Sequence, residues 1–327
     1  MKPQPDPGTA LRLVLAGSTS PLGRELQELL EGKACEWDVA LIETGQYESL
    51  IEEFGAHIDV VGALTNERIE SSEVVILACG PQIVNDYLER GAGLPRLTID
   101  LSGAPRPGPI FVRGLSGAWQ SPSQVVAVPR AEAIVLGHLL QRLDDAGGVS
   151  AAEATVLVPA SEHGIDGVER LERETAEVLN FRRPGPLDGR TTAFNVIVPD
   201  PTSRERKIRI SRQIGALGGA RCPAPSLQYA RIPLLHGMVL SIHVRTGREI
   251  TEEEALDILT RNGGDRTVVS GACTPAEVSG SDRIHVTHVE EGGDPGAMWL
   301  WVVVDNTRLV ADNVMALLDA YRAARDS

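Results

Sequence analysis

Short apolar runs alternate with segments of helical spacing along the first 130 residues of the chain. The predicted strands are Leu11–Ala16, Asp38–Glu43, Val74–Ala78, Leu97–Leu101 and Val125–Val128, and the predicted helices are Pro21–Leu30 and Ile83–Arg90. Strands that are apolar along their whole length are typical of a parallel sheet covered by helices on both faces. The first part of the chain is therefore predicted to be an α/β domain built on a parallel sheet.

The pattern changes near residue 130. Longer strands that alternate polar and apolar positions follow at Ala151–Val158, Leu227–Leu235, Met238–Val244, Arg283–His288 and Met298–Val304. The predicted helices of this part are Ala131–Leu143, Gly164–Leu179, Glu252–Thr260 and the amphipathic Arg308–Arg325. We predict a second, α+β domain with a mixed or antiparallel sheet. An apolar sheet face left uncovered would pair two copies into a homodimer.

The composition and net charge of the chain argue against some classes of binding partner. The 327 residues carry a net charge of -14, which argues against nucleic acid, because phosphate binding needs a surplus of basic side chains. No apolar run approaches the roughly 20 residues of a membrane span, and the polar Met1–Thr9 lacks the features of a signal peptide. The four cysteines form no CxxC pair, and the seven histidines show no metal-ligand spacing. We expect a cytoplasmic protein with reduced cysteines, no metal and no membrane contact.

A glycine-containing turn connects the first predicted strand to the first predicted helix. It consists of Gly17, Ser18, Thr19, Ser20, Pro21, Leu22 and Gly23. Small residues at this place let the backbone approach a pyrophosphate, and the helix N-terminus attracts its negative charge. Ser20 stands where the usual fingerprint has its middle glycine. The turn therefore indicates either a dinucleotide site or a tight strand-to-helix connection without a ligand.

Glu43 ends the second predicted strand, twenty positions after Gly23. In a dinucleotide-binding domain, an acid at this place accepts hydrogen bonds from the ribose 2′-hydroxyl and repels a 2′-phosphate. We therefore expect NAD to bind better than NADP. The alternative is an ordinary, solvated glutamate at a strand end.

Six motifs, in order along nearly the whole chain, resemble those of the aspartate-semialdehyde dehydrogenases. After the loop that ends at Gly23, they are Asp100-Leu-Ser102-Gly-Ala104-Pro-Arg106, Pro129-Arg-Ala131-Glu132, Ser161-Glu-His-Gly164-Ile-Asp-Gly167, Arg231-Ile-Pro233-Leu-Leu-His-Gly237-Met238 and Leu300-Trp301-Val-Val-Val-Asp305-Asn306. Each motif is weak by itself, but their shared order is hard to produce by chance.

The resemblance implies a fold and a set of site residues. It predicts a Rossmann-like NAD(P)-binding domain, residues 1–130 with 306–327, and a dimerisation domain, residues 131–305. Active members of the family use NADP, phosphate and a covalent thioester. Beyond the loop and Glu43, the residues expected at the cofactor site are Gly80, Ser161 and Gly164. Those expected at the substrate site are Arg106 for phosphate, Arg231 for the substrate carboxylate, and Lys207, with structural salt bridges as the alternative role of both arginines.

The residues on which the family chemistry depends are replaced at the matched positions. Ala131 stands in place of the nucleophilic cysteine, and Met238 in place of the basic histidine. Thioester formation needs a thiolate and a proton acceptor, which a methyl group and a thioether cannot supply. His236 stands two positions before Met238, so on a strand both side chains would lie on one face, roughly 7 Å apart.

Further positions depart from the family pattern. Ser211 stands where the family has the acid that holds the substrate ammonium group, and Glu162 replaces the first glycine of the nicotinamide-side loop. Cys79 is expected to be a small buried hydrophobe near the cofactor crevice. Cys222 lies in a Gly/Pro-rich loop without a base nearby in the sequence, so neither thiol is expected to replace the missing nucleophile.

The family includes Usg-type paralogues that keep the fold and lack the catalytic cysteine and histidine, and this chain resembles them. We therefore predict a catalytically inactive, semialdehyde dehydrogenase-like protein with residual NAD binding and a dimer-forming or regulatory role, open to a small-molecule ligand. The alternative is an active NAD(P)-dependent aspartate-semialdehyde dehydrogenase, or a reductase of the N-acetyl-glutamyl-phosphate type, in amino-acid biosynthesis.

Overall fold

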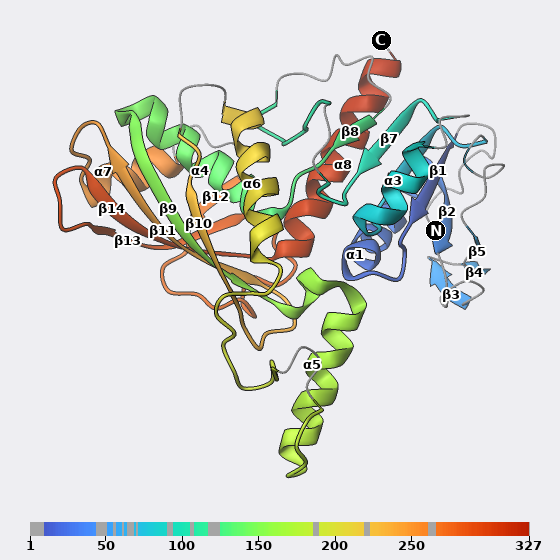
Figure 1. Cartoon of the computed structure of the whole chain (residues 1–327). Coiled ribbons are helices and arrows are strands. Elements are labelled where there is room, and N and C mark those ends of the chain that lie inside the picture. Colours follow the sequence, from blue (N-terminus) through green and yellow to red (C-terminus); the bar gives the residue numbers. More distant parts are fainter. Residues whose placement is uncertain are drawn as a thin grey trace. The chain divides into compact units, whose positions relative to one another are not determined.

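The structure is a computed structural model that divides into two compact units, residues 1–129 with 311–327 and residues 130–310 (Figure 1). It describes residues 10–43, 51–54, 57–60, 62–63, 69, 71–89, 94–104, 108–116, 125–185, 190–218, 223–260 and 266–326, without the side chains between 51 and 63.

The first unit contains a parallel sheet with the strand order β5-β2-β1-β6-β7-β8. Its strands are β1 (Leu11–Ala16), β2 (Trp37–Glu43), β5 (Gly62–Ala63), β6 (Val74–Leu77), β7 (Leu97–Asp100) and β8 (Val125–Ala127), beside a hairpin of β3 (Ile51–Phe54) and β4 (His57–Val60). Its helices are α1 (Pro21–Glu31), α3 (Pro81–Glu89) and the larger part of α8 (Asn306–Arg325). Every residue of β6 and β7 is buried, as expected of strands covered on both faces.

The C-terminal part of α8 is fixed to the first unit by polar contacts. Asp312 pairs with Arg113 at 3.1 Å, and the Tyr321 hydroxyl donates to Glu73 at 2.8 Å. Asp319 and Arg322 form ion pairs with Lys33 and Glu36, which follow α1. The last helix is therefore an integral part of this unit, although it begins in the other one.

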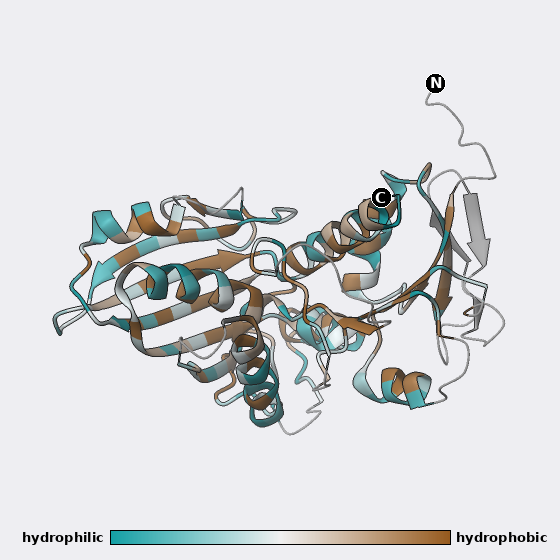
Figure 2. Cartoon of the chain, turned by 90° about the horizontal axis from the view of Figure 1, so that it is seen from above, coloured by the Kyte–Doolittle hydropathy of each residue, from teal (hydrophilic) through white to brown (hydrophobic). Residues whose placement is uncertain are grey.

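The second unit contains a mixed sheet with the strand order β10-β9-β11-β14-β13-β12. The strands are β9 (Val149–Val158), β10 (Ser226–Arg231), β11 (Met238–Thr246), β12 (Thr267–Val269), β13 (Ile284–Glu291) and β14 (Ala297–Val304). The helices are α4 (Ala131–Gly147), the 3-10 helix η2 (Ala160–His163), α5 (Gly164–Leu179), α6 (Ser203–Gly218) and α7 (Glu252–Thr260). Figure 2 shows hydrophilic and hydrophobic bands alternating along its strands, in line with the alternating burial of β9 and β11.

The structure confirms the predicted fold class, a Rossmann-like parallel sheet followed by an α+β unit. Helices α5 and α7 begin and end where the sequence pattern predicts them. The predicted strand Leu227–Leu235 is wrong beyond Arg231, because β10 ends there and a loop leads to Gly237 at a φ of +87°. Helix α6 was not predicted from periodicity, since its basic residues surround the helix and Ile208 is half exposed.

Candidate functional site

The loop between β1 and α1 is packed too tightly for side chains at its two ends. Gly17 has a φ of +84°, and a Cβ on it would lie 2.5 Å from the Ala78 carbonyl oxygen. A Cβ on Gly23 would lie 2.1 Å from the carbonyl oxygen of Gly17. Both glycines are therefore required by the internal packing of the loop, whether or not a ligand binds.

Ser20 uses its hydroxyl within the loop. It caps α1 by accepting a hydrogen bond from the Gly23 N–H at 3.0 Å, and it donates to the Gly17 carbonyl at 2.8 Å. Pro21 and Leu22 follow as the partly exposed first residues of the helix. The serine thus occupies one of the helix N-terminal amides that would otherwise face an anion.

Glu43 is not a solvated glutamate, so that alternative is wrong. Only 7% of its surface is exposed, and its carboxylate accepts a hydrogen bond from the Thr19 hydroxyl at 2.7 Å. Ser18 beside it is buried as well. The Thr19 hydroxyl therefore occupies part of the acceptor capacity of this carboxylate.

Cys79 follows β6 and packs against the apolar core of the first unit. Burial raises the pKa of its thiol, and the charge of Glu43 raises it further, to about 12. The sulfur is therefore a protonated thiol near neutral pH and a poor nucleophile. Gly80, the next residue, is exposed just before α3.

The two matched catalytic positions both lie in the second unit. Ala131 is the first residue of α4, and Met238 is the first residue of β11, paired with Val304 of β14. Both side chains are fully buried. His236 lies in the loop before β11 and is exposed, so the expectation that it shares a strand face with Met238 is wrong.

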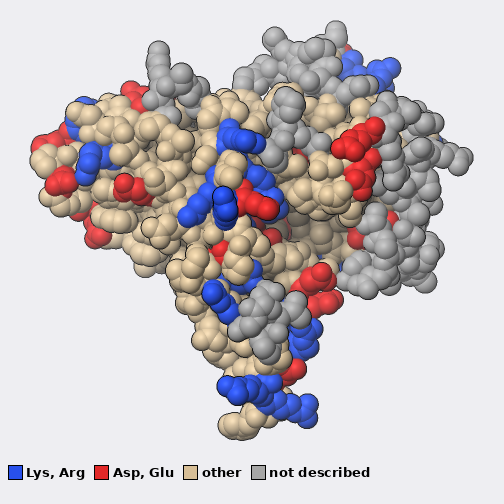
Figure 3. Space-filling view, in the orientation of Figure 1, with Lys and Arg blue, Asp and Glu red and all other residues tan. Residues whose placement is uncertain are grey.

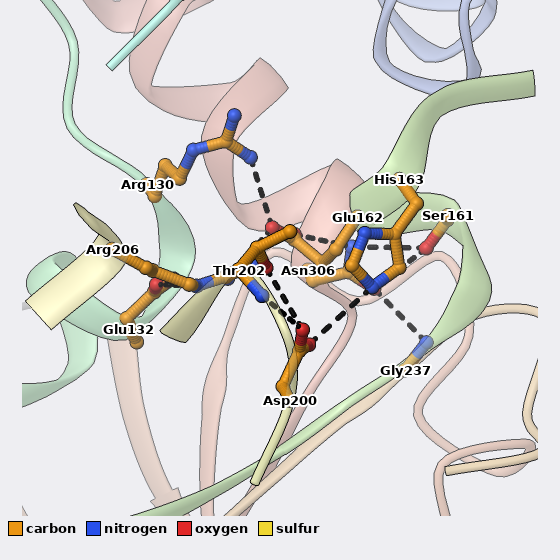
Figure 4. Close-up of polar contacts among 10 residues, drawn as sticks. All are labelled: Arg130, Glu132, Ser161, Glu162, His163, Asp200, Thr202, Arg206, Gly237 and Asn306. Carbon is orange, nitrogen blue, oxygen red and sulfur yellow. Dashed lines mark hydrogen bonds and ion pairs between the residues drawn. The ribbon is translucent and has the colours of Figure 1, made fainter. Parts of the chain in front are cut away.

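Charged side chains flank Ala131 on both sides and form a largely buried cluster, with Arg130 at its partly exposed edge. We call it the charge cluster: Arg130, Glu132, Glu162 and Arg206 (Figure 4). Arg206 of α6 donates to Glu132 at 2.6 Å and to Glu162 at 2.8 Å. Arg130 donates to Glu162 at 3.0 Å. The cluster thus ties the start of α4 to α6 and to η2 through charge-assisted hydrogen bonds.

Asn306, the first residue of α8, extends the charge cluster toward Met238. Its amide nitrogen donates to Glu162 at 2.8 Å and to Ser161 at 3.1 Å. Its amide oxygen accepts the N–H of Gly237, the neighbour of Met238, at 3.0 Å. One continuous network therefore connects Glu132 and Gly237, the chain neighbours of the two matched catalytic positions (Figure 4).

The electrostatics of the charge cluster favour the ionised forms of Glu162 and Arg206. Burial alone would raise the pKa of Glu162, but Arg206, Arg130 and the Asn306 hydrogen bond lower it to about 2. Burial would lower the pKa of Arg206, yet Glu132 and Glu162 raise it above its usual value. The Arg206 guanidinium also lies 5.3 Å from the centre of the Tyr229 ring, in range of a cation–π contact.

Arg231, expected to bind a substrate carboxylate, is buried beside an internal carboxylate instead. Its guanidinium lies 3.4 Å from Asp200, whose other oxygen lies 3.5 Å from the His163 imidazole. Burial would raise the pKa of Asp200, but the neighbouring His163 and the hydrogen bonds from Thr202 hold it below the usual range. Arg231 is therefore already paired within the unit.

The other expected site residues lie apart from these pairs. Lys207 and Ser211 are partly exposed on α6, and Gly164 has a φ of +73° where η2 meets α5. Arg106 and Cys222 lie outside the residues that the structure describes.

Sequence reasoning missed several members of the site. Asp200 lies outside the matched motifs, and Arg206 directly precedes the matched Lys207 but was given no role. The partners of both are distant in the chain. Glu132 and Asn306 do stand within two of the six family-like motifs, and this position could have marked them as candidate site residues. The Glu132 carboxylate and the Asn306 amide join the hydrogen-bond network only through contacts that form on folding.

Within the described part of the chain, no helix is long and apolar enough to cross a membrane. Among the same residues, no group of three or more His, Cys, Asp or Glu side chains is placed to hold a metal ion.

Comparisons with known proteins show which proteins the chain is similar to. No family model matches it. It is 26% identical to a USG-1 protein homolog of Azotobacter vinelandii, over 91% of this chain and 94% of that protein. It is 24% identical to the aspartate-semialdehyde dehydrogenase of Corynebacterium melassecola, over 90% of this chain and 94% of that protein.

A solved structure extends the likeness to three dimensions. A probable aspartate-semialdehyde dehydrogenase from Pseudomonas aeruginosa matches with a TM-score of 0.82 and 25% identity, over 95% of this chain and 98% of that one. With six motifs in order and both sheets of the expected type, the chain is similar to the aspartate-semialdehyde dehydrogenases over nearly its whole length, and these likenesses support its assignment to that family.

Proposed function

We propose that this chain is a non-catalytic, dimer-forming member of the family that does not carry out thioester chemistry. The observation that carries the proposal is Ala131 at the nucleophile position, buried at the start of α4. Attack on an aldehyde carbon needs a thiolate there, and the attack needs a base to take the thiol proton. Met238 at the base position is a buried thioether without a proton to exchange.

The described cysteines offer no substitute for this sulfur. Cys79 belongs to the first unit, and its raised pKa keeps the thiol protonated. Burial and the charge of Glu277 raise the pKa of Cys273 as well. Cys35 is exposed in the turn after α1. A relocated nucleophile would also need a base within hydrogen-bond reach.

The charge cluster supports the same conclusion. Glu132 and Glu162 are neutralised by Arg206 and Arg130, and Arg231 is paired with Asp200. Charged groups that serve catalysis are aimed at reacting atoms, whereas these are aimed at one another. The arrangement stabilises the second unit and pairs Arg231 with Asp200.

For the cofactor, we propose residual binding of NAD in preference to NADP. A nicotinamide cofactor would supply hydride transfer when bound in this fold class. The proposal for this chain concerns only the binding of the cofactor. Gly17 and Gly23 keep the loop geometry, while Ser20 removes one amide from the anion-facing set. The negative charge of the buried Glu43 would repel a 2′-phosphate. Calorimetric titration with each cofactor tests this, and tighter binding of NADP would contradict it.

The homodimer is proposed to form through the uncovered face of the second sheet. Trp299 and Trp301 of β14 lie on the same side of the strand and are 39% and 40% exposed. His243 of β11 lies beside Trp299, with their ring centres 4.6 Å apart. Aromatic side chains exposed on a sheet are typical of a protein–protein surface. Light scattering at micromolar concentration should give a dimer mass, and a monomer mass would contradict the proposal.

A turnover assay tests the central part of the proposal. The purified chain is incubated with aspartate semialdehyde, phosphate and either NAD or NADP, and reduced cofactor is followed by absorbance. We expect no rate above the protein-free blank, while an active aspartate-semialdehyde dehydrogenase assayed alongside gives a clear rate. Phosphate-dependent turnover by the unmodified chain would refute the proposal.

A further inference from the structure

A groove of the first unit lies outside the residues that the proposed function uses. Its volume is about 630 Å³, within the range of small-molecule pockets. It is bordered by the C-terminal end of α1, by the segment 111–116 and by α8, all within the first unit. The cofactor loop precedes the opposite, N-terminal end of α1. The groove is therefore distinct from the expected cofactor site.

Much of the groove lining is apolar. Phe111 and Met315 are buried beneath it, and Leu29 of α1 contributes a further apolar side chain. Ala316 and Ala320 lie one helical turn apart on α8, and their methyl groups fill little of the space. An apolar group placed in the groove would be removed from water, which favours its binding.

The charges that line the groove are balanced. Among the described lining residues, Arg113 pairs with Asp312 at 3.1 Å, and Lys33 pairs with Asp319. The two aspartates are seven residues apart on α8, roughly 10 Å along the helix. Lys and Arg side chains gather instead over α6 of the second unit (Figure 3). A balanced groove in a chain with a net charge of -14 favours a neutral ligand over an anion.

The pair of Arg113 and Asp312 can hold two opposite charges that lie close together. Their side chains are 39% and 21% exposed, so a ligand can reach both. Arg113 contacts Asp312 through one terminal nitrogen, whereas a guanidinium has five N–H donors. A carboxylate can likewise accept more than one hydrogen bond. A ligand carboxylate on the arginine and a ligand ammonium on the aspartate would both form charge-assisted hydrogen bonds.

We propose that this groove binds a zwitterionic α-amino acid with a large apolar side chain. Its carboxylate and ammonium meet Arg113 and Asp312, and its side chain lies along the apolar lining toward Ala316. The inference goes beyond the proposed function, because it gives the chain a ligand site away from the cofactor loop and from Ala131.

The first test is a calorimetric titration of the full chain with L-tryptophan. We expect one binding event with a dissociation constant of about 1 mM or tighter. Two analogues each remove one charge: N-acetyl-L-tryptophan has no ammonium, and L-tryptophanamide has no carboxylate. Each should bind roughly tenfold more weakly or worse, as expected for the loss of a charge-assisted hydrogen bond. No binding of L-tryptophan, or equal binding of all three compounds, would overturn the inference.

Two variants then locate the site. Ala316→Phe fills the groove and should weaken L-tryptophan binding roughly tenfold or more, whereas Ala324→Phe, at an exposed position of the same helix, should change it by no more than about twofold. Arg113→Gln should weaken the binding of L-tryptophan about tenfold and leave that of L-tryptophanamide nearly unchanged, because the amide has no carboxylate to lose. Thermal unfolding without ligand shows that each variant is folded.

Equal affinities of Ala316→Phe and Ala324→Phe, or an unchanged affinity of Arg113→Gln for L-tryptophan, would contradict the assignment of the groove. If Ala316→Phe does not fold, Arg113→Gln with the two analogues decides the question. Turnover of aspartate semialdehyde would instead overturn the proposed function and leave this binding test readable.

Discussion

The Gly17–Gly23 loop and the charge cluster satisfy their polar groups in different ways. In the loop, a single short side chain, Ser20, folds back and takes one helix N-terminal amide. In the charge cluster, side chains from α4, η2 and α6 pair their charges over long sequence separations. A single substitution of Ser20 can release the backbone amide of the loop. In the charge cluster, any single substitution that breaks an ion pair leaves a buried charge with fewer partners. The first region is therefore expected to tolerate change and the second to resist it.

Removal of Arg206 should give the largest effect. Arg206→Met would leave Glu132 and Glu162 buried with fewer partners, since Arg206 contacts both. We expect the free energy of unfolding to fall by about 3–5 kcal/mol, as measured by urea denaturation. Arg204→Met, an exposed position on the same helix, should change it by about 0.5 kcal/mol or less. Similar small effects for both variants would show that the charge cluster does not stabilise the second unit.

The acid stability of the second unit should depend on Glu162. Its pKa falls from 4.5 to about 2 in the folded chain. Because the folded pKa is depressed, its stabilisation is present above pH 4.5 and is lost as the pH falls toward 2. This group should account for a loss on the order of 3 kcal/mol over that window. Glu162→Gln should flatten the pH dependence of unfolding there, and the exposed Glu205→Gln should leave it unchanged. An unchanged slope in Glu162→Gln would contradict the assignment.

The smallest effect is expected in the loop. Ser20→Gly would release the Gly23 N–H and restore room for a pyrophosphate. One recovered backbone donor should tighten NAD binding about two- to tenfold, measured by calorimetry. Loss of the cap should lower stability by only a few tenths of a kcal/mol, because glycine is itself a tolerated cap. Unchanged or weaker NAD binding would indicate that Ser20 does not limit the site.

The sequence predicts best the features that depend on local patterns. The apolar strands of the first unit, helices α5 and α7, and the tight loop at Gly17 each follow from spacing that neighbouring residues set. Helix α6 was missed because its basic residues surround the helix instead of forming one polar face.

The chemistry of the site is set by distant contacts and could not be predicted in the same way. Arg206 meets Glu132 across 74 positions, and Asp200 meets Arg231 across 31. His236 was misplaced because the turn at Gly237, with its positive φ, interrupts an otherwise apolar run. Composition and periodicity carry no information about such pairings, which depend on how the helices pack against the sheet.

The most direct test of the account is a search for the covalent intermediate itself. The unmodified chain is incubated with aspartate semialdehyde and oxidised NAD or NADP without phosphate, so that any thioester would accumulate, and its intact mass is measured. Because Ala131 has no sulfur, we predict an unchanged mass under conditions in which an active relative acquires the acyl group. A cofactor-dependent acyl adduct on a cysteine of this chain, released when phosphate is added, would contradict the account.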